Sequence, residues 1–240
     1  MNLRVFENAE DMATAVADEL IRQIEARKRS VVGLSGGATP RRMYELLGSG
    51  FRRGRIQEAE LIWVLGDERL VPPYHPESNS RLIQETLFQH GIPERHRFIR
   101  FRTDLENPQR IANEFEADLR EVVGERPIDL FILGVGEDGH TASLFPGTSA
   151  LDERERWAVA VDVPQLHTSR LTVTLPVLQG AALRWVLASG ASKRAVIEEV
   201  QGGADLPVAL ATRGEGETWW FADREAWDPD QTLREARGGR

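Results

Sequence analysis

Short apolar runs and longer segments with a helical period alternate along the whole chain. Runs such as LIWVL and LFIL have the length and apolarity typical of buried strands. In the first helical segment, which Asn8 can cap, the apolar residues that share one face are Ala13, Val16, Ala17, Leu20 and Ile24. Strands are predicted at 3–6, 30–34, 61–65, 97–101, 128–133, 157–163, 170–175, 183–189 and 218–222, and further helices at 40–47, 79–90, 108–123 and 192–200.

This alternation is typical of parallel strands joined by crossover helices. The sequence therefore predicts an α/β fold with three layers, α/β/α. Its doubly wound, mostly parallel, Rossmann-like sheet is covered on both faces, with room for a small antiparallel region at one edge. No internal repeat or linker interrupts the pattern, so we expect residues 1–240 to form a single domain. The polar segment at about 229–240 is expected to be a flexible tail.

Composition and charge narrow the class of protein. Hydrophobic residues make up 41% and charged residues 28% of the 240 positions, the balance of a globular protein. No apolar run approaches the roughly 20 residues that a membrane-spanning helix needs, and the N-terminus shows no signal peptide, so we expect a cytoplasmic protein without membrane contact. The absence of cysteine excludes disulfides, thiolate catalysis and cysteine-ligated metals. The net charge of −8 argues against nucleic acid as a partner, so an anionic ligand has to be attracted locally.

The segment DLFILGVGEDGHTASLFP, residues 129–146, carries the strongest chemical signal. A buried strand runs into a turn containing three glycines, and Asp138 and His140 stand where the strand ends. Ligands of open α/β sheets bind at that edge, and histidine is the side chain best suited to move a proton near neutral pH. The alternative is an ordinary strand-to-helix turn with a surface histidine.

A second glycine-rich turn, with the sequence SGGATP, joins the strand at 30–34 to the next helix. Thr39 is a suitable N-cap and Pro40 suits the first helical position. The helix N-terminus offers unpaired N–H groups to a phosphate, and Ser35, Gly36 and Gly37 allow it to approach. The segment lacks the Gly-Lys-Ser/Thr element of a P-loop. A tight structural turn explains the pattern equally well.

Charged residues follow two further strands. In an extended exit from the strand at 61–65, Asp67 and Arg69 point to one side and Glu68 to the other. The strand at 183–189 ends in GASK, and Lys193 in the first turn of a helix favours a bound anion there. A solvated charge cluster and a surface lysine are the alternatives. Because the four clusters all follow strands, a parallel sheet would gather them at one edge.

Metal and nucleophilic chemistry find no support in the sequence. His90, His96 and His167 are scattered, without the spacing of metal ligands. The chain has no cysteine and no G-x-S-x-G elbow, so Ser35 and Ser143 are interpreted as hydrogen-bonding or capping residues.

Taken together, several separated motifs resemble the 6-phosphogluconolactonases, which share a superfamily and a fold with glucosamine-6-phosphate deaminases. The motifs lie in family order between about 30 and 200 and read GLSGGATP, GDERLVPPYHPESN, LGVGEDGHTASLFPG, RLTVTLP and GASK. The resemblance implies hydrolysis of 6-phospho-D-glucono-1,5-lactone to 6-phosphogluconate in the oxidative pentose phosphate pathway, without metal or cofactor. The expected partner is this small-molecule phosphosugar lactone, and the chain is expected to be a monomer or a homodimer.

The resemblance also implies a role for each candidate residue. His140 would be the general base that activates water, with Asp138 orienting it, and Asp67 would orient the site or assist proton transfer. Arg69 would contact the phosphate or the developing oxyanion, and Arg170 is an additional candidate for the same anion. The residues implied to hold the 6-phosphate are Ser35, Gly36, Gly37, Thr39 and Lys193.

Two alternative functions, a deaminase and a non-enzymatic sensor, are each expected to show sequence features that this chain lacks. The deaminases of the superfamily follow the DGH motif with Asn-Glu-Pro, whereas this chain has SLFP at 143–146 and DER where deaminases commonly have an aromatic residue. A non-enzymatic sugar-phosphate sensor needs an attached DNA-binding domain, for which an acidic chain with its first strand at about residue 3 has no room. The lactonase interpretation is therefore preferred.

Overall fold

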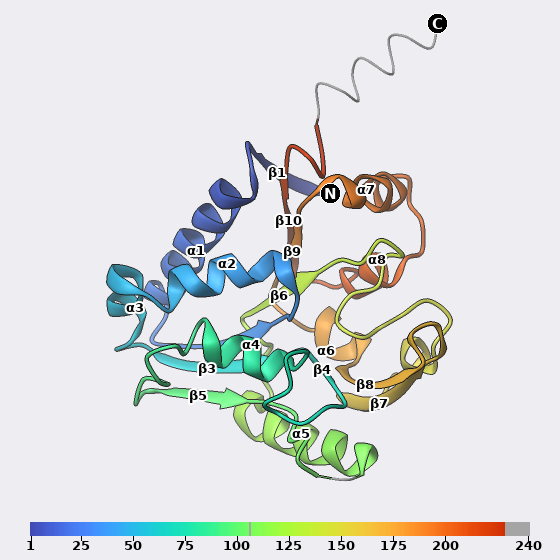
Figure 1. Cartoon of the computed structure of the whole chain (residues 1–240), viewed down its shortest axis with the longest axis horizontal. Coiled ribbons are helices and arrows are strands. Elements are labelled where there is room, and N and C mark those ends of the chain that lie inside the picture. The colour runs from blue at the N-terminus through green and yellow to red at the C-terminus, as the bar shows by residue number, and fades with distance from the viewer. Residues whose placement is uncertain (106, 229–240) are drawn as a thin grey trace, which may run out of the picture.

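The computed structural model describes residues 1–105 and 107–228. Within them, seven parallel strands form one sheet in the order β1-β10-β9-β6-β2-β3-β5, from the top of Figure 1 to the bottom. The expected flexible tail at 229–240 lies outside the described residues. The strands are β1 (Asn2–Phe6), β2 (Arg29–Leu34), β3 (Glu60–Leu65), β5 (His96–Ile99), β6 (Leu130–Gly134), β9 (Leu183–Ala188) and β10 (Glu217–Asp223).

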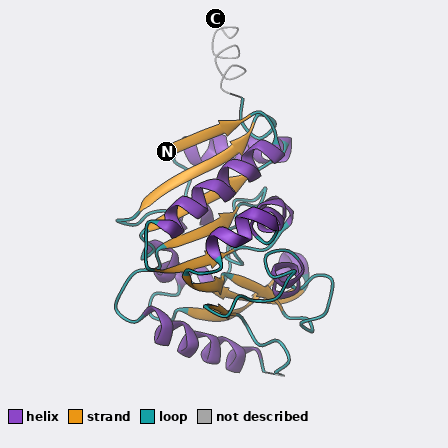
Figure 2. Cartoon of the chain, turned by 90° about the vertical axis from the view of Figure 1, so that its left-hand side faces the viewer, coloured by secondary structure: helices purple, strands orange, loops and turns teal. Residues whose placement is uncertain are grey.

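Helices cover both faces of this sheet, which Figure 2 shows as a twisted ladder of strands. The helices are α1 (Ala9–Glu25), α2 (Ala38–Leu47), α3 (Gly50–Ile56), α4 (Asn79–Glu85), α5 (Pro108–Val123), α6 (Leu175–Gln179), α7 (Arg194–Gln201) and α8 (Pro207–Ala211). Short 3-10 turns lie at Ser149–Asp152, Pro164–Leu166 and Ala191–Lys193. The predicted three-layer α/β/α architecture is confirmed.

A second, antiparallel sheet of three strands has the order β4-β8-β7. Its strands are β4 (Asp67–Arg69), β7 (Ala158–Val163) and β8 (Thr168–Val173). Strand β4 follows β3 after only Gly66, so the small sheet begins at the C-terminal edge of the large one. The antiparallel region that the sequence allowed is therefore present as a separate sheet.

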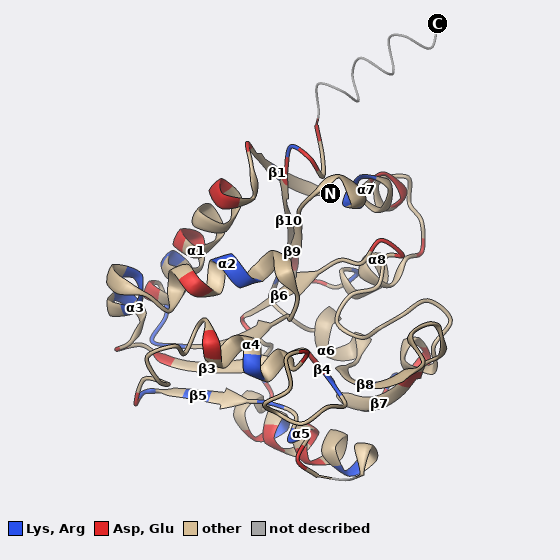
Figure 3. Cartoon of the chain, in the orientation of Figure 1, with Lys and Arg blue, Asp and Glu red and all other residues tan. Residues whose placement is uncertain are grey.

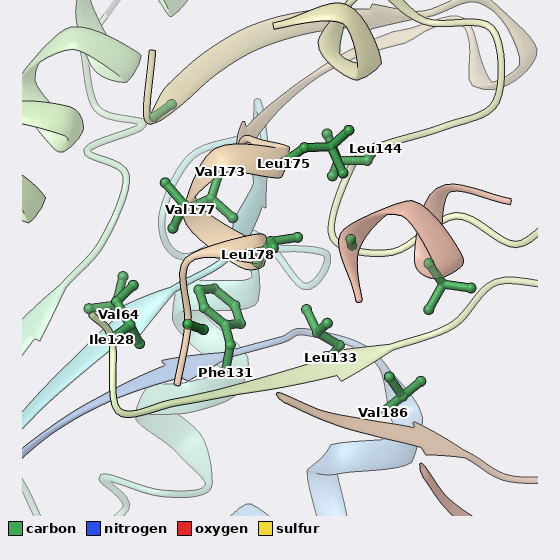
Figure 4. Packing of buried hydrophobic residues seen from close by; sticks show 14 of the residues in the cluster. Val64, Ile128, Phe131, Leu133, Leu144, Val173, Leu175, Val177, Leu178 and Val186 are labelled. Atoms are coloured by element: carbon green, nitrogen blue, oxygen red, sulfur yellow. The ribbon is translucent and has the colours of Figure 1, made fainter. Parts of the chain in front are cut away.

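The alternation of side chains along each strand divides the core into two clusters. On β6, Leu130 and Ile132 pack with the cluster that contains α1 and α2, whereas Phe131 and Leu133 pack with the opposite one. Figure 4 shows Phe131 and Leu133 facing the side chains of α6, among them Leu178. Strands buried on both faces are typical of parallel sheets, which explains their continuous apolar sequences.

The predicted strands are all found, within a residue or two of their expected ends, but three boundaries need correction. Helix α2 begins at Ala38 with Gly37 as N-cap, not Thr39, because Gly37 adopts φ 95° and turns the chain earlier. Helix α4 ends at Glu85 and does not extend to 90. Strand β8 ends at Val173, and Leu175, predicted as strand, begins α6, with proline as the second residue of that helix.

Candidate active site

A pocket of about 710 Å³ lies at the C-terminal edge of the parallel sheet. The turns after β2, β6 and β9 line it, together with β4 and β8 of the small sheet. All the candidate residues named from the sequence lie on its wall: Ser35, Gly36, Gly37, Thr39, Asp67, Arg69, Asp138, His140, Arg170 and Lys193. The expectation that clusters distant in sequence converge at one edge is therefore confirmed.

His140 and Asp138 form a close pair in the turn after β6. The Nδ1 atom of His140 lies 2.6 Å from Oδ1 of Asp138, and the His140 backbone N–H donates to the same oxygen at 3.1 Å. The imidazole stacks on Phe145, with ring centroids 4.1 Å apart. A Cβ atom at Gly136 would lie 2.0 Å from Nδ1 of His140, so the pair needs glycine at that position.

The charge of Asp138 decides which nitrogen of His140 can act as a base. Burial tends to raise the pKa of Asp138, but hydrogen bonds from the backbone and ring of His140 outweigh it and lower that pKa below its usual value. An ionised carboxylate accepts only, so we assign the Nδ1 proton to His140 on this contact. In the neutral imidazole, Nε2 is then the nitrogen without a proton.

The turn after β2 presents the N-terminus of α2 to the pocket. Gly37 provides no side-chain cap, and the residues that follow it, as far as Pro40, line the wall. The first N–H groups of a helix lack intrahelical partners and carry partial positive charge, which favours an anion. Tyr44 fixes the turn by donating its hydroxyl to the Ser35 carbonyl at 2.8 Å. The Ser35 hydroxyl itself has no hydrogen-bond partner in the described part of the chain.

Asp67 is buried, and both of its carboxylate oxygens accept hydrogen bonds. Ser143 donates its hydroxyl to Oδ2 at 2.8 Å, and Asn79 donates from Nδ2 to Oδ1 at 3.2 Å. The interpretation of Ser143 as a hydrogen-bonding residue is confirmed by this contact, whereas Asn79 was not predicted as a site residue. The available signal was that Ser78 or Asn79 can start a helix; in the structure Ser78 caps α4 and Asn79 is buried.

Two arginines face each other across the antiparallel pair β4 and β8. Arg69 is directly opposite Arg170 in the register, and the predicted placement of Glu68 on the other side is confirmed by its complete burial away from the pocket wall. Burial, and then the neighbouring charge of Arg69, lower the pKa of Arg170. Because like charges directly opposite each other destabilise a strand pair, this arrangement favours a bound anion.

Lys193 reaches the pocket from the turn after β9. It is the last residue of the 3-10 turn and the N-cap of α7. The buried Asp223, at the end of β10, accepts from the Gly190 backbone N–H at 3.1 Å and from the Ser189 hydroxyl. The turn that carries Lys193 is thus fixed by the last strand of the chain.

The pocket wall carries both cations and carboxylates, and charges of both signs also alternate on the surrounding helices. Figure 3 shows basic and acidic segments interspersed on α2, α4 and α5. Within residues 1–105 and 107–228, no group of three or more histidine and acidic side chains is arranged to hold a metal ion. No helix in that part of the chain has the length and apolarity needed to cross a membrane.

The sequence and the fold of this chain are similar to those of known proteins. The chain matches the family described as glucosamine-6-phosphate isomerases/6-phosphogluconolactonase over residues 6–220. A curated 6-phosphogluconolactonase from Haemophilus influenzae is 31% identical over 230 residues, which cover 94% of this chain and 98% of the relative. Another from Rhizobium meliloti is 32% identical over 224 residues, covering 88% and 94%. The solved structure of 6-phosphogluconolactonase from Leishmania guyanensis is similar with a TM-score of 0.82 and 26% identity, covering 95% of this chain and 98% of that one.

Proposed function

This chain belongs to the family of glucosamine-6-phosphate isomerases and 6-phosphogluconolactonases, and we propose that it hydrolyses 6-phospho-D-glucono-1,5-lactone to 6-phosphogluconate. This is the second step of the oxidative pentose phosphate pathway. The names of curated relatives from several species support a lactone hydrolase. The reacting groups and their roles are inferred from the pocket.

One observation carries the proposal: a histidine–carboxylate pair and three cations line the same pocket. Among the described residues, no salt bridge joins Arg69, Arg170 or Lys193 to a carboxylate, although the charges of Asp67, Glu77 and Glu68 act on Arg170 from nearby. Ester hydrolysis needs a base to activate water and positive charge to stabilise the oxyanion. A phosphorylated lactone needs a second anion site, and this pocket has cations enough for both.

We assign the 6-phosphate to the turn after β2 and to Lys193. The uncapped N-terminus of α2 supplies N–H donors, and the unpaired hydroxyl of Ser35 can donate as well. Binding at this end holds the sugar ring, so the lactone carbonyl is presented to His140 in a fixed orientation.

In the proposed reaction, Nε2 of His140 takes a proton from a water molecule as the water oxygen bonds to C1 of the lactone. The carbonyl oxygen becomes an alkoxide, which Arg69 and Arg170 are placed to stabilise. The bond between C1 and the ring oxygen then breaks, and the ring oxygen receives the proton from the His140 imidazolium. Asp67, held by Ser143, orients the substrate through its remaining acceptor sites.

Turnover of freshly generated lactone by the purified protein tests the proposal, after correction for spontaneous ring opening. The wild type is expected to hydrolyse the lactone and to leave glucosamine 6-phosphate unreacted. His140→Ala is expected to lower kcat by about 10²-fold or more, because the base is lost. The exposed His90 provides the matched control, since His90→Ala removes an imidazole that does not line the pocket.

Full activity of His140→Ala would remove that residue as the base while leaving the reaction standing. Deamination of glucosamine 6-phosphate in place of lactone hydrolysis would assign the chain to the other branch of its family. Binding of both sugars without turnover would instead indicate a sensor.

A further inference from the structure

We propose that Asn79 is a positioning residue that keeps Asp67 and Arg69 apart, so that both charges remain available to the substrate. The inference rests on the proposed lactonase function for its kinetic consequence, but its structural basis is independent of that function.

The side-chain amide of Asn79 bridges the two opposite charges. Its Nδ2 donates to the Asp67 backbone carbonyl at 2.9 Å and to the Asp67 carboxylate at 3.2 Å. Its Oδ1 accepts from Nη1 of Arg69 at 2.8 Å. An amide is suited to this place because it presents a donor to the carboxylate and an acceptor to the guanidinium. A symmetrical side chain such as leucine or aspartate cannot do both.

The spacing of Asp67 and Arg69 on β4 would allow the two side chains to form an ion pair if Asn79 did not lie between them. Asp67 and Arg69 are two positions apart on β4, so their side chains emerge on the same side, roughly 7 Å apart along the strand. A carboxylate and a guanidinium within that reach favour a bidentate ion pair. Such a pair would neutralise the cation that faces Arg170 and would occupy the Asp67 oxygens. In the structure Arg69 instead donates to Asn79 and to the Glu77 carbonyl.

Two neighbours hold Asn79 in place. The fully buried Glu68 carboxylate accepts from the backbone N–H groups of Asn79 and Ser80, each at 2.7 Å, which ties the start of α4 to β4. On the other side, an ideal Cβ at Gly36 would lie 1.9 Å from Oδ1 of Asn79. The missing side chain at Gly36 therefore admits the bridging amide, in addition to any approach of a phosphate.

Two substitutions of Asn79 distinguish the effect of its hydrogen bonds to Asp67 and Arg69 from the effect of its packing. Asn79→Leu removes all three side-chain hydrogen bonds, and the nearly isosteric Asn79→Asp keeps the shape but sets a carboxylate against Asp67. Both variants are expected to lower kcat and to raise the Kd for 6-phosphogluconate, each by about tenfold, a change of the size that one lost hydrogen bond to a charged group produces. Ile83→Val is the control, because it loosens the buried face of α4 without touching the pocket wall.

The control is expected to lower Tm while kcat and Kd stay within about twofold of the wild type. If Asn79→Asp retained wild-type kcat and Kd, the amide would be packing only and the inference would be overturned.

A double-mutant cycle with Arg69 tests whether Asn79 acts through its partner. In the Arg69→Met background, Asn79→Leu is expected to change the Kd for 6-phosphogluconate by less than about twofold, because no ion pair between Asp67 and residue 69 can then form. Full additivity of the two effects would contradict the inference.

A crystal structure of Asn79→Leu tests the inference without an activity measurement. We expect a direct ion pair between Asp67 and Arg69 in that variant. Arg69 remaining on the Glu77 carbonyl with no contact to Asp67 would overturn the inference, even if lactone hydrolysis had been established. Conversely, the ion pair in a protein that hydrolyses no lactone would leave the inference intact and refute the proposed function.

Discussion

At the scale of single residues, the glycines of the pocket serve two distinct needs. Gly37 and Gly139 adopt φ 95° and 77°, a backbone conformation that side chains resist. Gly36 and Gly136 adopt no such φ, and glycine is required there because Asn79 and the His140 ring occupy the space of a Cβ. The sequence predicted turns at these glycines. Only the structure shows which of them are needed for a positive φ and which for the close approach of another side chain.

Gly136→Ala is expected to displace His140, because its Cβ would lie 2.0 Å from Nδ1 and 2.6 Å from the Asp138 carboxylate. We expect kcat to fall by about 10²-fold with a smaller change in KM, since the base moves while the phosphate site stays in place. Steady-state kinetics of lactone hydrolysis checks this expectation. Gly54→Ala in α3, where a Cβ meets open space, is the control, and equal losses in both variants would contradict it.

Asp138→Asn tests the assignment of the Nδ1 proton. The amide can offer its N–H to Nδ1, which favours the wrong tautomer and leaves Nε2 protonated. We expect kcat to fall by about 10²-fold or more at pH 7 while KM stays close to the wild-type value. Glu137→Gln removes the neighbouring acid on the pocket wall, and wild-type kinetics are expected for it. A comparable loss in both variants would point to net charge and not to the tautomer.

At the scale of elements, a buried histidine joins the edge strand β5 to β3 and α3. His96 accepts from the Trp63 indole N–H at 3.2 Å and, through Nε2, contacts the Ile56 carbonyl at 3.0 Å. Burial lowers the pKa of His96 below 6.5. The folded state therefore keeps the ring neutral where the unfolded chain takes up a proton, so stability is lost as pH falls below about 6.5.

Between pH 7.5 and 5.5, His96 is expected to reduce the free energy of unfolding by up to about 1 kcal/mol. Urea unfolding at both pH values measures this difference. His96→Phe is expected to flatten the pH dependence by that amount, whereas His90→Ala, at an exposed site, is expected to leave it unchanged. A wild-type slope in His96→Phe would assign the acid sensitivity to other groups.

A buried arginine closes the C-terminal end of α6. Arg184 on β9 donates to the carbonyls of Leu178, Gln179 and Ala181 at 3.2, 2.9 and 2.9 Å. Arg184→Met is expected to lower the free energy of unfolding by about 3 kcal/mol or more, because several buried carbonyls lose a charged donor. Urea unfolding checks this value, and the exposed Arg110→Met should change it by less than about 0.5 kcal/mol. Similar losses would show that the carbonyls find other partners.

Local patterns predicted some elements well and missed others for physical reasons. Helix α5 was predicted at 108–123 and spans Pro108–Val123, because the Asn107 cap and a regular apolar face mark it. Helix α3, GFRRGRI, has one buried residue and hence no stripe to detect. Strands β7 and β8 were predicted, but their direction was not. The four residues between Val163 and Thr168 are too few for a parallel crossover, a signal that indicates a hairpin.

At the scale of the whole molecule, the two sheets share one core. Phe131 and Leu133 of the parallel sheet belong to the same apolar cluster as Leu171 and Val173 of the antiparallel one. We therefore propose that the chain unfolds as a single domain. Urea transitions followed by far-UV circular dichroism and by tryptophan fluorescence are expected to share one midpoint. An earlier loss of amide protection confined to β7 and β8 would contradict this proposal.

The site was predictable to the extent that sheet topology determines it. Clusters after β2, β3, β6 and β9 had to meet once the strands were parallel, and they do. Asn79 could not be found in the same way, because it follows no strand of that sheet and enters the pocket by way of contacts with Glu68 and Gly36. Such side-chain bridges depend on tertiary packing, which a strand-end pattern does not encode.

The position of β1 has a consequence for synthesis on the ribosome. Among the described strands, β1 pairs in the sheet with β10 alone, with Asn2 paired to Trp219 and Phe6 to Asp223. The nascent chain therefore leaves β1 unpaired until β10, which follows it by about 200 residues, has been synthesised. The same last strand supplies Asp223, which fixes the Lys193 turn. Both the pairing of β1 and the fixing of the Lys193 turn therefore require β10 to have been synthesised, and a chain truncated before β10 lacks both.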